Sequence, residues 1–180
     1  MYNNSSIEQQ VAGKGGAASM TKIIKNTSIY VHPLGEHGVF MNSKTSTYTG
    51  FEFEIDDFPA VAIINKDLAD KSIQAKYSSS IFIEVIPDSF NEHGHPKEAE
   101  YDYLVDIEKK MMDYLEDQTG TVHVGHITSY RKLEIIFYTK EPQKAEGFLS
   151  YFLSTIEREN TFEIEADATW ENVSAFYELL

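Results

Sequence analysis

The 180-residue chain contains no cysteine, and this absence excludes several kinds of site. Without thiols it can form no disulfide framework, no thiolate nucleophile and no cysteine-based zinc site. No stretch approaches the roughly 18 continuous apolar residues that a membrane span requires, and the N-terminus lacks the apolar run of a secretory signal. These absences predict a cytoplasmic protein without a membrane partner.

Basic residues are also scarce. Fifteen lysines and arginines stand against 29 aspartates and glutamates, which gives a formal net charge of −14. A field of this sign repels phosphate backbones and attracts basic surfaces. We therefore expect no nucleic-acid partner and consider a basic protein partner possible, while the sequence leaves the oligomeric state open.

The pattern along the chain predicts one α+β domain over residues 20–180, preceded by a flexible tail or cloning remnant at residues 1–19. Residues 20–75 form a β-rich part, in which "FEFEID" at residues 51–56 alternates apolar and acidic side chains as a strand does. Residues 76–180 form the core of the domain.

The core has a regular order of elements. Strands are expected at residues 80–86, in a hairpin at residues 121–139, and at residues 161–166, with helices at residues 97–118 and from Pro142 onward. The first helix carries a buried stripe and ends before Gly120, its C-terminal cap; the stripe consists of Leu104, Ile107, Met111 and Leu115. The order β-α-β-β-α-β predicts a ferredoxin-like split unit, with both helices on one face of a four-stranded antiparallel sheet and extra N-terminal strands beside it.

Three stretches carry a resemblance to a known family: "YLVDIEKKMMDYLE", "VGHITSYRKLEIIFYTKEP" and "DATW". On these motifs the chain, over roughly residues 80–180, resembles a bacterial domain-of-unknown-function family, numbered six hundred and ninety-five. The resemblance implies the fold and no activity, because no activity of the family can be carried over.

Alternation along the strands predicts which side chains line the sheet face that the helices leave open. The predicted set is Phe82, Glu84, Ile86, His123, His126, Glu134, Ile136, Tyr138, Glu163 and Glu165. Such a face combines four carboxylates, two histidines and an aromatic patch.

His123 and His126 join this set only through a bulge. On a regular strand, residues three apart face opposite sides, and His126 would point into the core. An isolated glycine in a strand often marks a bulge, and Gly125 lies between the two histidines. With a bulge, Ile127 enters the core and both imidazoles reach the helix-free face, which is the arrangement we favour because it buries no imidazole.

Three interpretations of this face stay open. It is a face that is solvated or covered by the N-terminal strands, a docking surface for a basic protein with Tyr138, Phe82 and Ile86 as apolar anchors, or a metal or acid–base site. That last site would consist of His123, His126 and Glu134. A second histidine cluster, His93 and His95, lies in the loop "NEHGHPKE" and could chelate a metal weakly.

No nucleophile motif is present, so we assign no catalytic residue, no metal ligand set and no cofactor. The expected function is that of a binding or regulatory protein, in its most concrete form an acidic inhibitor or immunity-type module for a basic partner. The alternative is a metal-dependent or small-molecule-processing enzyme that uses the open sheet face.

Overall fold

The structure, a computed structural model, describes residues 46–180. The predicted tail and the first part of the β-rich region lie outside the described residues. Six strands are present in the described part: β1 (Tyr48–Ile55), β2 (Phe58–Asn65), β3 (Ser79–Val85), β4 (Thr121–Ser129), β5 (Lys132–Thr139) and β6 (Asn160–Ala166). The long helices are α3 (Glu98–Thr119) and α4 (Pro142–Leu153), and the short ones are η1 (Lys66–Ala69), α2 (Lys71–Gln74), η2 (Glu171–Val173) and α5 (Ser174–Glu178).

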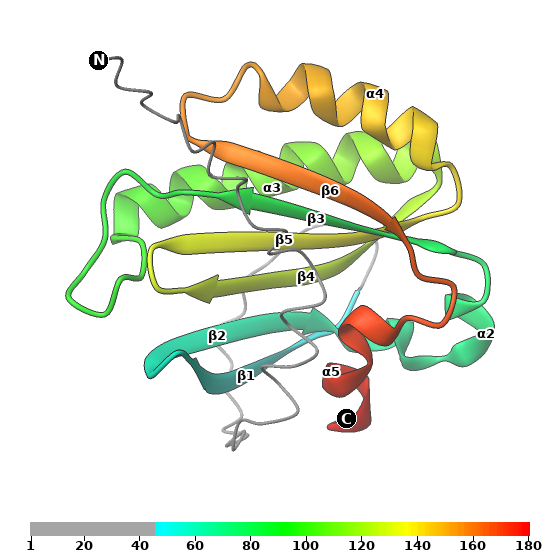
Figure 1. Ribbon diagram of the computed structural model, residues 1–180, viewed down its shortest axis with the longest axis horizontal. Helices are drawn as coiled ribbons and strands as arrows, with labels where there is room; N and C mark the ends of the chain where they lie inside the picture. The colour runs from blue at the N-terminus through cyan, green and yellow to red at the C-terminus, as the bar shows by residue number, and fades with distance from the viewer. Residues whose placement is uncertain (1–45) are drawn as a thin grey trace, which may run out of the picture.

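All six strands form one antiparallel sheet in the order β1-β2-β4-β5-β3-β6, which confirms an α+β protein (Figure 1). The β1–β2 hairpin turns through Asp56 and Asp57, both at positive φ, a conformation that aspartate tolerates better than most residues. Because β2 pairs with β4, this hairpin widens the sheet at the β4 side and does not lie across a face. Within the described residues, β1 and β6 are therefore the two edge strands.

One face of the sheet is covered by α3 and α4, as the sequence predicts. The stripe of Leu104, Ile107, Met111 and Leu115 is buried and belongs to the same core cluster as Leu149 of α4. This cluster also contains alternate residues of β3 and β5, such as Ile83 and Ile135. Gly120 ends α3 in the left-handed conformation, and its N–H donates to the Leu115 carbonyl.

The other face has a second core, which the sequence analysis did not anticipate. Trp170, Val173 and Phe176 of the C-terminal segment are fully buried there and pack with residues of β1, β2, β4 and β5. Trp170 stacks on Tyr138, with ring centroids 3.9 Å apart. The sheet is thus apolar on both faces, and much of the face expected to be open is closed by the chain's own C-terminal end (Figure 1).

Asp167 anchors this C-terminal cover. Its carboxylate accepts a hydrogen bond from the Tyr138 hydroxyl at 2.5 Å and from the backbone N–H groups of Glu171 and Asn172 at 2.9 and 3.0 Å. The two backbone donors lie at the start of η2, where N–H groups have no partner within the helix. The covering segment is therefore held to β5 at the residue just before it begins.

Among residues 46–180, no helix has both the length and the apolar character needed to cross a membrane.

Candidate functional site

The predicted bulge in β4 is present. The pairing of β4 with β5 shifts register between His123 and Gly125, so that His123 lies opposite Phe137 and His126 lies opposite Ile135. Both imidazoles consequently point to one face, as the bulged arrangement requires. The predicted face, however, is wrong: Phe137 and Ile135 belong to the core beneath α3 and α4, and the histidines are buried there with them.

The reason for this inversion is the second core. Val124 and Ile127 are fully buried in the cluster that Trp170 closes, on the face opposite the long helices. The bulge does bring the apolar residues of β4 to one side of the strand. Both faces of the sheet have an apolar core, however, so these residues could pack on either face. The helix-covered face receives the imidazoles, since α3 supplies a polar partner for them.

Gly125 is required where it stands. Its φ is 149°, and a Cβ atom at this position would lie 1.9 Å from the carbonyl oxygen of Ile63 on β2. Glycine alone lets the backbones of β2 and β4 approach this closely. The bulge, and with it the common orientation of the two histidines, therefore depends on this residue.

The polar partner of the histidines is Glu108, a fully buried carboxylate on α3. Its Oε1 lies 2.8 Å from Nε2 of His123, and Nδ1 of His126 lies 2.9 Å from both of its carboxylate oxygens. The hydroxyl of Tyr48 lies 2.9 Å from the other ring nitrogen of His123. A chain of hydrogen bonds thus joins β1, β4 and α3; we call Tyr48, Glu108, His123 and His126 the buried network.

The protons of the buried network follow from its chemistry. An ionised carboxylate only accepts hydrogen bonds, so Nε2 of His123 and Nδ1 of His126 both donate to Glu108. Burial opposes the charge of Glu108, but the two histidines outweigh it and lower the pKa of Glu108 from 4.5 to about 2. Burial and nearby carboxylates raise the pKa of Tyr48, which keeps its proton on the hydroxyl.

Sequence reasoning missed Glu108, although a signal was available. Glu108 follows Ile107 and lies four residues after Leu104 and four before Met112, which places a carboxylate beside the buried stripe of α3. A charged side chain at such a position is almost never fully buried unless it is paired. A glutamate at this position therefore predicts that the strand beneath α3 supplies hydrogen-bond donors for its carboxylate.

The structure does not assemble the predicted metal or acid–base set. Glu134 lies opposite Ile127 on the other face of the sheet, away from both histidines. Within residues 46–180, no cluster of three or more histidine, aspartate or glutamate side chains has the arrangement of a metal site. In the buried network, both oxygens of Glu108 already accept hydrogen bonds from imidazoles.

The histidines of the 91–98 loop are used separately. His93 is exposed and lies 3.6 Å from Glu92. The Nε2 atom of His95 lies 2.8 Å from the carbonyl oxygen of Pro59, so this ring ties the loop to the start of β2.

The remaining predicted face residues divide into two groups. Phe82, Ile136 and Tyr138 are buried in the second core, so Phe82 and Tyr138 cannot be the exposed anchors that we expected. Ile86 lies just past β3, half-buried. Of the acidic residues, Glu134 is buried, Glu84 and Glu165 are half-buried, and Glu163 is exposed.

Glu84 and Glu134 are paired across β3 and β5 and share a cation. Lys132 Nζ lies 2.9 Å from the Glu84 carboxylate and 3.4 Å from that of Glu134. Burial raises the pKa of Glu134 against the opposing effect of Lys132. The negative charge of Glu84 and Glu134 is therefore partly neutralised by Lys132 of the same chain.

Glu163 and Glu165 lie on β6, opposite Phe82 and Ser80 of β3. No lysine or arginine among the described residues forms an ion pair with either of them. Burial and the neighbouring Glu163 carboxylate raise the pKa of Glu165. The two carboxylates thus crowd each other at an edge of the sheet, without the cation that Glu84 and Glu134 possess.

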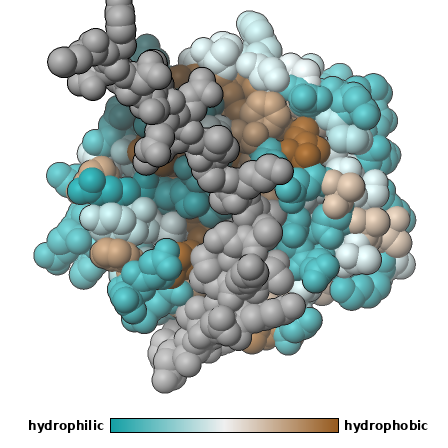
Figure 2. All heavy atoms as spheres, in the orientation of Figure 1, coloured by the Kyte–Doolittle hydropathy of each residue, from teal (hydrophilic) through white to brown (hydrophobic). Residues whose placement is uncertain are grey.

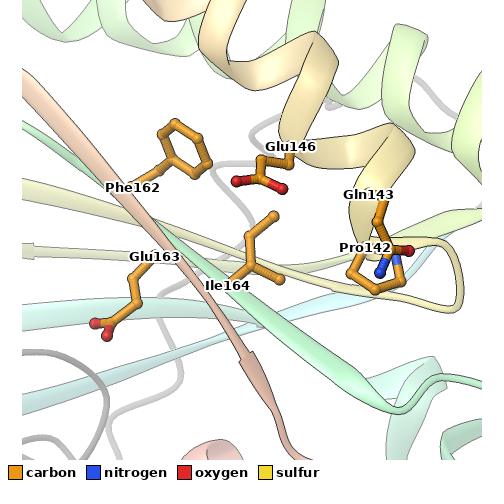
Figure 3. A pocket seen from close by; sticks show the side chains of 6 residues that line it. All are labelled: Pro142, Gln143, Glu146, Phe162, Glu163 and Ile164. Carbon is orange, nitrogen blue, oxygen red and sulfur yellow. The ribbon is translucent and has the colours of Figure 1, made fainter.

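A hollow of about 420 Å³ lies beside this edge, between β6 and α4. It is lined by Pro142, Gln143, Glu146, Phe162, Glu163 and Ile164. Phe162 and Ile164 point toward α4, from which Glu146 extends toward them, whereas the side chain of Glu163 points away (Figure 3). In the view that Figures 1 and 2 share, hydrophilic side chains cover most of the visible described surface, with apolar atoms in smaller patches.

The fold and these sites define an α+β protein with a two-sided sheet core and an acidic edge. The chain belongs to the family of unknown function DUF695, whose model matches residues 48–177. The match begins at β1, so the family's domain includes the β1–β2 hairpin, which the resemblance seen in the sequence did not cover. No curated protein and no solved structure matches this chain.

Proposed function

We propose that this protein is a binding module that takes a basic protein partner at the acidic edge formed by Glu163 and Glu165, and that it acts on its partner as an inhibitor or immunity-type module. The observation that carries the proposal is the difference between the two pairs of carboxylates on this side of the sheet. Glu84 and Glu134 have Lys132 between them, whereas Glu163 and Glu165 face no lysine or arginine of the described chain. A cation from a partner would relieve the repulsion between them.

The arrangement of the strands supports this assignment. We infer that the unit β3-α3-β4-β5-α4-β6 is a ferredoxin-like split unit, in agreement with its strand order β6-β3-β5-β4 and with the placement of α3 and α4 on one face. In this unit β6 is a terminal strand. The β1–β2 hairpin extends the sheet at the β4 side and leaves β6 at the boundary of the described structure.

The net charge of −14 supports the choice of partner. It attracts a basic protein over a long range and accelerates encounter, and both effects weaken as salt screens the charges. Glu163 is exposed and Glu165 is half-buried, and they contribute little affinity on their own, because surface ion pairs give about 0.2–1 kcal/mol each. Specificity must then come from the surface next to them, where the hollow between β6 and α4 lies.

The test is a titration of a fluorescein-labelled oligolysine peptide, followed by fluorescence anisotropy at low and at physiological salt. We expect binding that weakens as salt rises. The double variant Glu163→Lys and Glu165→Lys should bind about tenfold more weakly, since it removes two such ion pairs and adds repulsion.

The matched control is Asp113→Lys with Asp117→Lys. Both aspartates are exposed on α3, and the pair changes the net charge by the same amount. The control should lower affinity much less than the β6 variant. Equal losses in the two variants would mean that the peptide senses only net charge, and the proposal would be wrong.

A further inference from the structure

In the described part of the sheet, β6 is an edge strand. Its seven residues, Asn160–Ala166, all pair with β3 in a continuous antiparallel register, and within residues 46–180 no strand pairs with its other side. In an antiparallel strand, half of the backbone N–H and C=O groups point to each side. The outward half is therefore available to another extended chain.

Three common protections of an edge strand, namely lysine, proline and a bulge, are missing from β6. Edge strands commonly carry lysine, proline or a bulge, which discourage pairing with other chains. The sequence "NTFEIEA" has neither lysine nor proline, and its register with β3 contains no shift. The charges that it does carry, Glu163 and Glu165, repel an acidic strand and attract a basic one.

The hollow gives the same edge a place for side chains. Phe162 and Ile164 point to the α4 side of β6, where Pro142 and Gln143 form the opposite wall (Figure 3). Side chains of an added strand would alternate between this side, where Phe162 and Ile164 lie beside the carboxylate of Glu146, and the side of Glu163 and Glu165. A groove between an edge strand and a helix is a setting in which proteins bind extended peptides by strand addition.

We propose that β6 is the docking strand for an extended basic segment of a partner protein, which adds to the sheet as a further strand. Its apolar side chains pack over Phe162 and Ile164 beside α4, and its lysines or arginines lie against Glu163 and Glu165. This inference rests on the proposed function and specifies how the basic partner is held.

A second copy of this chain fits the edge less well. Pairing β6 with β6 of another copy would bring Glu163 and Glu165 of both copies together, and like charges opposite each other destabilise a strand pair. The net charge of −14 on each copy adds to this repulsion. The complementary occupant is a basic segment of another protein.

The test compares three labelled peptides of alternating lysine and valine by anisotropy with the full chain. One is unmodified, one has N-methylated backbone amides at its lysines, and one has them at its valines. Each methylated peptide lacks the donors along one of its edges but keeps charge and side-chain order. Strand addition predicts that one of the two methylated peptides binds about tenfold more weakly than the unmodified one, because several hydrogen bonds worth about 0.5–1.5 kcal/mol each are lost.

A variant of the protein tests the groove. Gln143→Trp should fill the hollow and weaken binding of the unmodified peptide. Gln118→Trp, the same substitution at an exposed position on α3, should leave it unchanged.

The outcomes separate this inference from the proposed function. If both methylated peptides bind as well as the unmodified one, the segment is held by charge alone; strand addition is then wrong and the proposed function stands. If oligolysine binds but the alternating peptide does not, strand addition is likewise wrong. If no basic peptide binds, both proposals fail. A dimer in sedimentation velocity that the peptide cannot dissociate would assign the edge to a second copy.

Discussion

Carboxylates occupy two contrasting places in this molecule, the buried network under α3 and the edge strand β6. Glu108 is fully buried and accepts hydrogen bonds from His123 and His126 of the same chain. Glu163 and Glu165 lie at the rim of the sheet, and among the described residues their charged neighbours are other carboxylates. Glu108 is paired with two imidazoles, whereas Glu165 has a hydrogen bond with Asn172 but, like Glu163, forms no ion pair with a lysine or arginine among residues 46–180. Glu108 therefore serves the architecture, whereas the proposed partner would supply Glu163 and Glu165 with the cation that they lack within the described chain.

The comparison also corrects the role of the histidines. The sequence predicts both on an open face, but both ring nitrogens of His123 are used by Glu108 and Tyr48, and Nδ1 of His126 is used by Glu108. A buried carboxylate without donors is strongly destabilising, so the imidazoles are needed to keep α3 on the sheet. Loss of this network should therefore affect stability far more than loss of any carboxylate on β6.

The largest expected effect is that of Glu108→Ala. This substitution leaves two buried imidazoles without their acceptor and opens a cavity under α3, so the free energy of unfolding should fall by about 3–5 kcal/mol. Urea unfolding followed by the fluorescence of Trp170 measures it, since Trp170 is the sole tryptophan of the chain and is fully buried.

Asp113→Ala is the matched control for Glu108→Ala, because Asp113 is exposed on the same helix. It should change the free energy of unfolding by no more than about 0.5 kcal/mol. A loss at Glu108 as small as that of this control would mean that the buried network contributes nothing, and the contrast with β6 would disappear.

The next effect is that of Gly125→Ala. A methyl group would meet the Ile63 carbonyl at 1.9 Å, and alanine does not tolerate a φ of 149°. Backbone strain of this kind costs about 1–3 kcal/mol, and the clash would move β2 away from β4. Gly147→Ala, where an added Cβ meets nothing within 4 Å, is the control in α4. It should stabilise the protein by up to about 1 kcal/mol, and equal behaviour of the two variants would contradict the role of Gly125.

Several features of the fold can be predicted from short stretches of the sequence. The stripe on α3, the cap at Gly120 and the bulge at Gly125 each follow from a short pattern and its geometry. A short pattern does not show to which face of the sheet the bulge turns Val124 and Ile127, because these apolar side chains could pack in either of the two cores. The second core depends on the contact between Trp170 and Tyr138, which are 32 positions apart in the chain. The periodicity of a single strand or helix does not predict such a contact.

The candidate site was predictable in part for the same reason. Alternation placed Glu84, Glu134, Glu163 and Glu165 on one face, and the register confirms this placement. Alternation could not show that Lys132 forms ion pairs with Glu84 and Glu134, since these depend on the direction of a long side chain. The hollow beside β6 depends on the position of α4, which the sequence pattern does not fix.

The smallest expected effect, and the one of opposite sign, is that of Glu165→Gln. Removing a carboxylate that Glu163 repels should leave the free energy of unfolding at neutral pH unchanged or higher by up to about 0.5 kcal/mol. The pH dependence sharpens the contrast with Glu108. Because the folded pKa of Glu108 is lowered from 4.5 to about 2, its contribution is complete above pH 4.5 and is lost as the pH falls toward 2. Because the folded pKa of Glu165 is raised, the folded state holds this proton more readily, and stability increases as the pH falls through that pKa toward 4.5.

Urea unfolding of the wild type, Glu108→Gln and Glu165→Gln across the acidic range tests both signs. The wild type should be more stable than Glu108→Gln at neutral pH, and no more stable than Glu165→Gln. Both differences should close in acid, from opposite sides, because protonation removes the charge that each substitution removes. A wild type that is clearly more stable than Glu165→Gln at neutral pH would show that the charge of Glu165 is already stabilised within the chain. The proposal that β6 needs a cation from a partner protein would then be wrong.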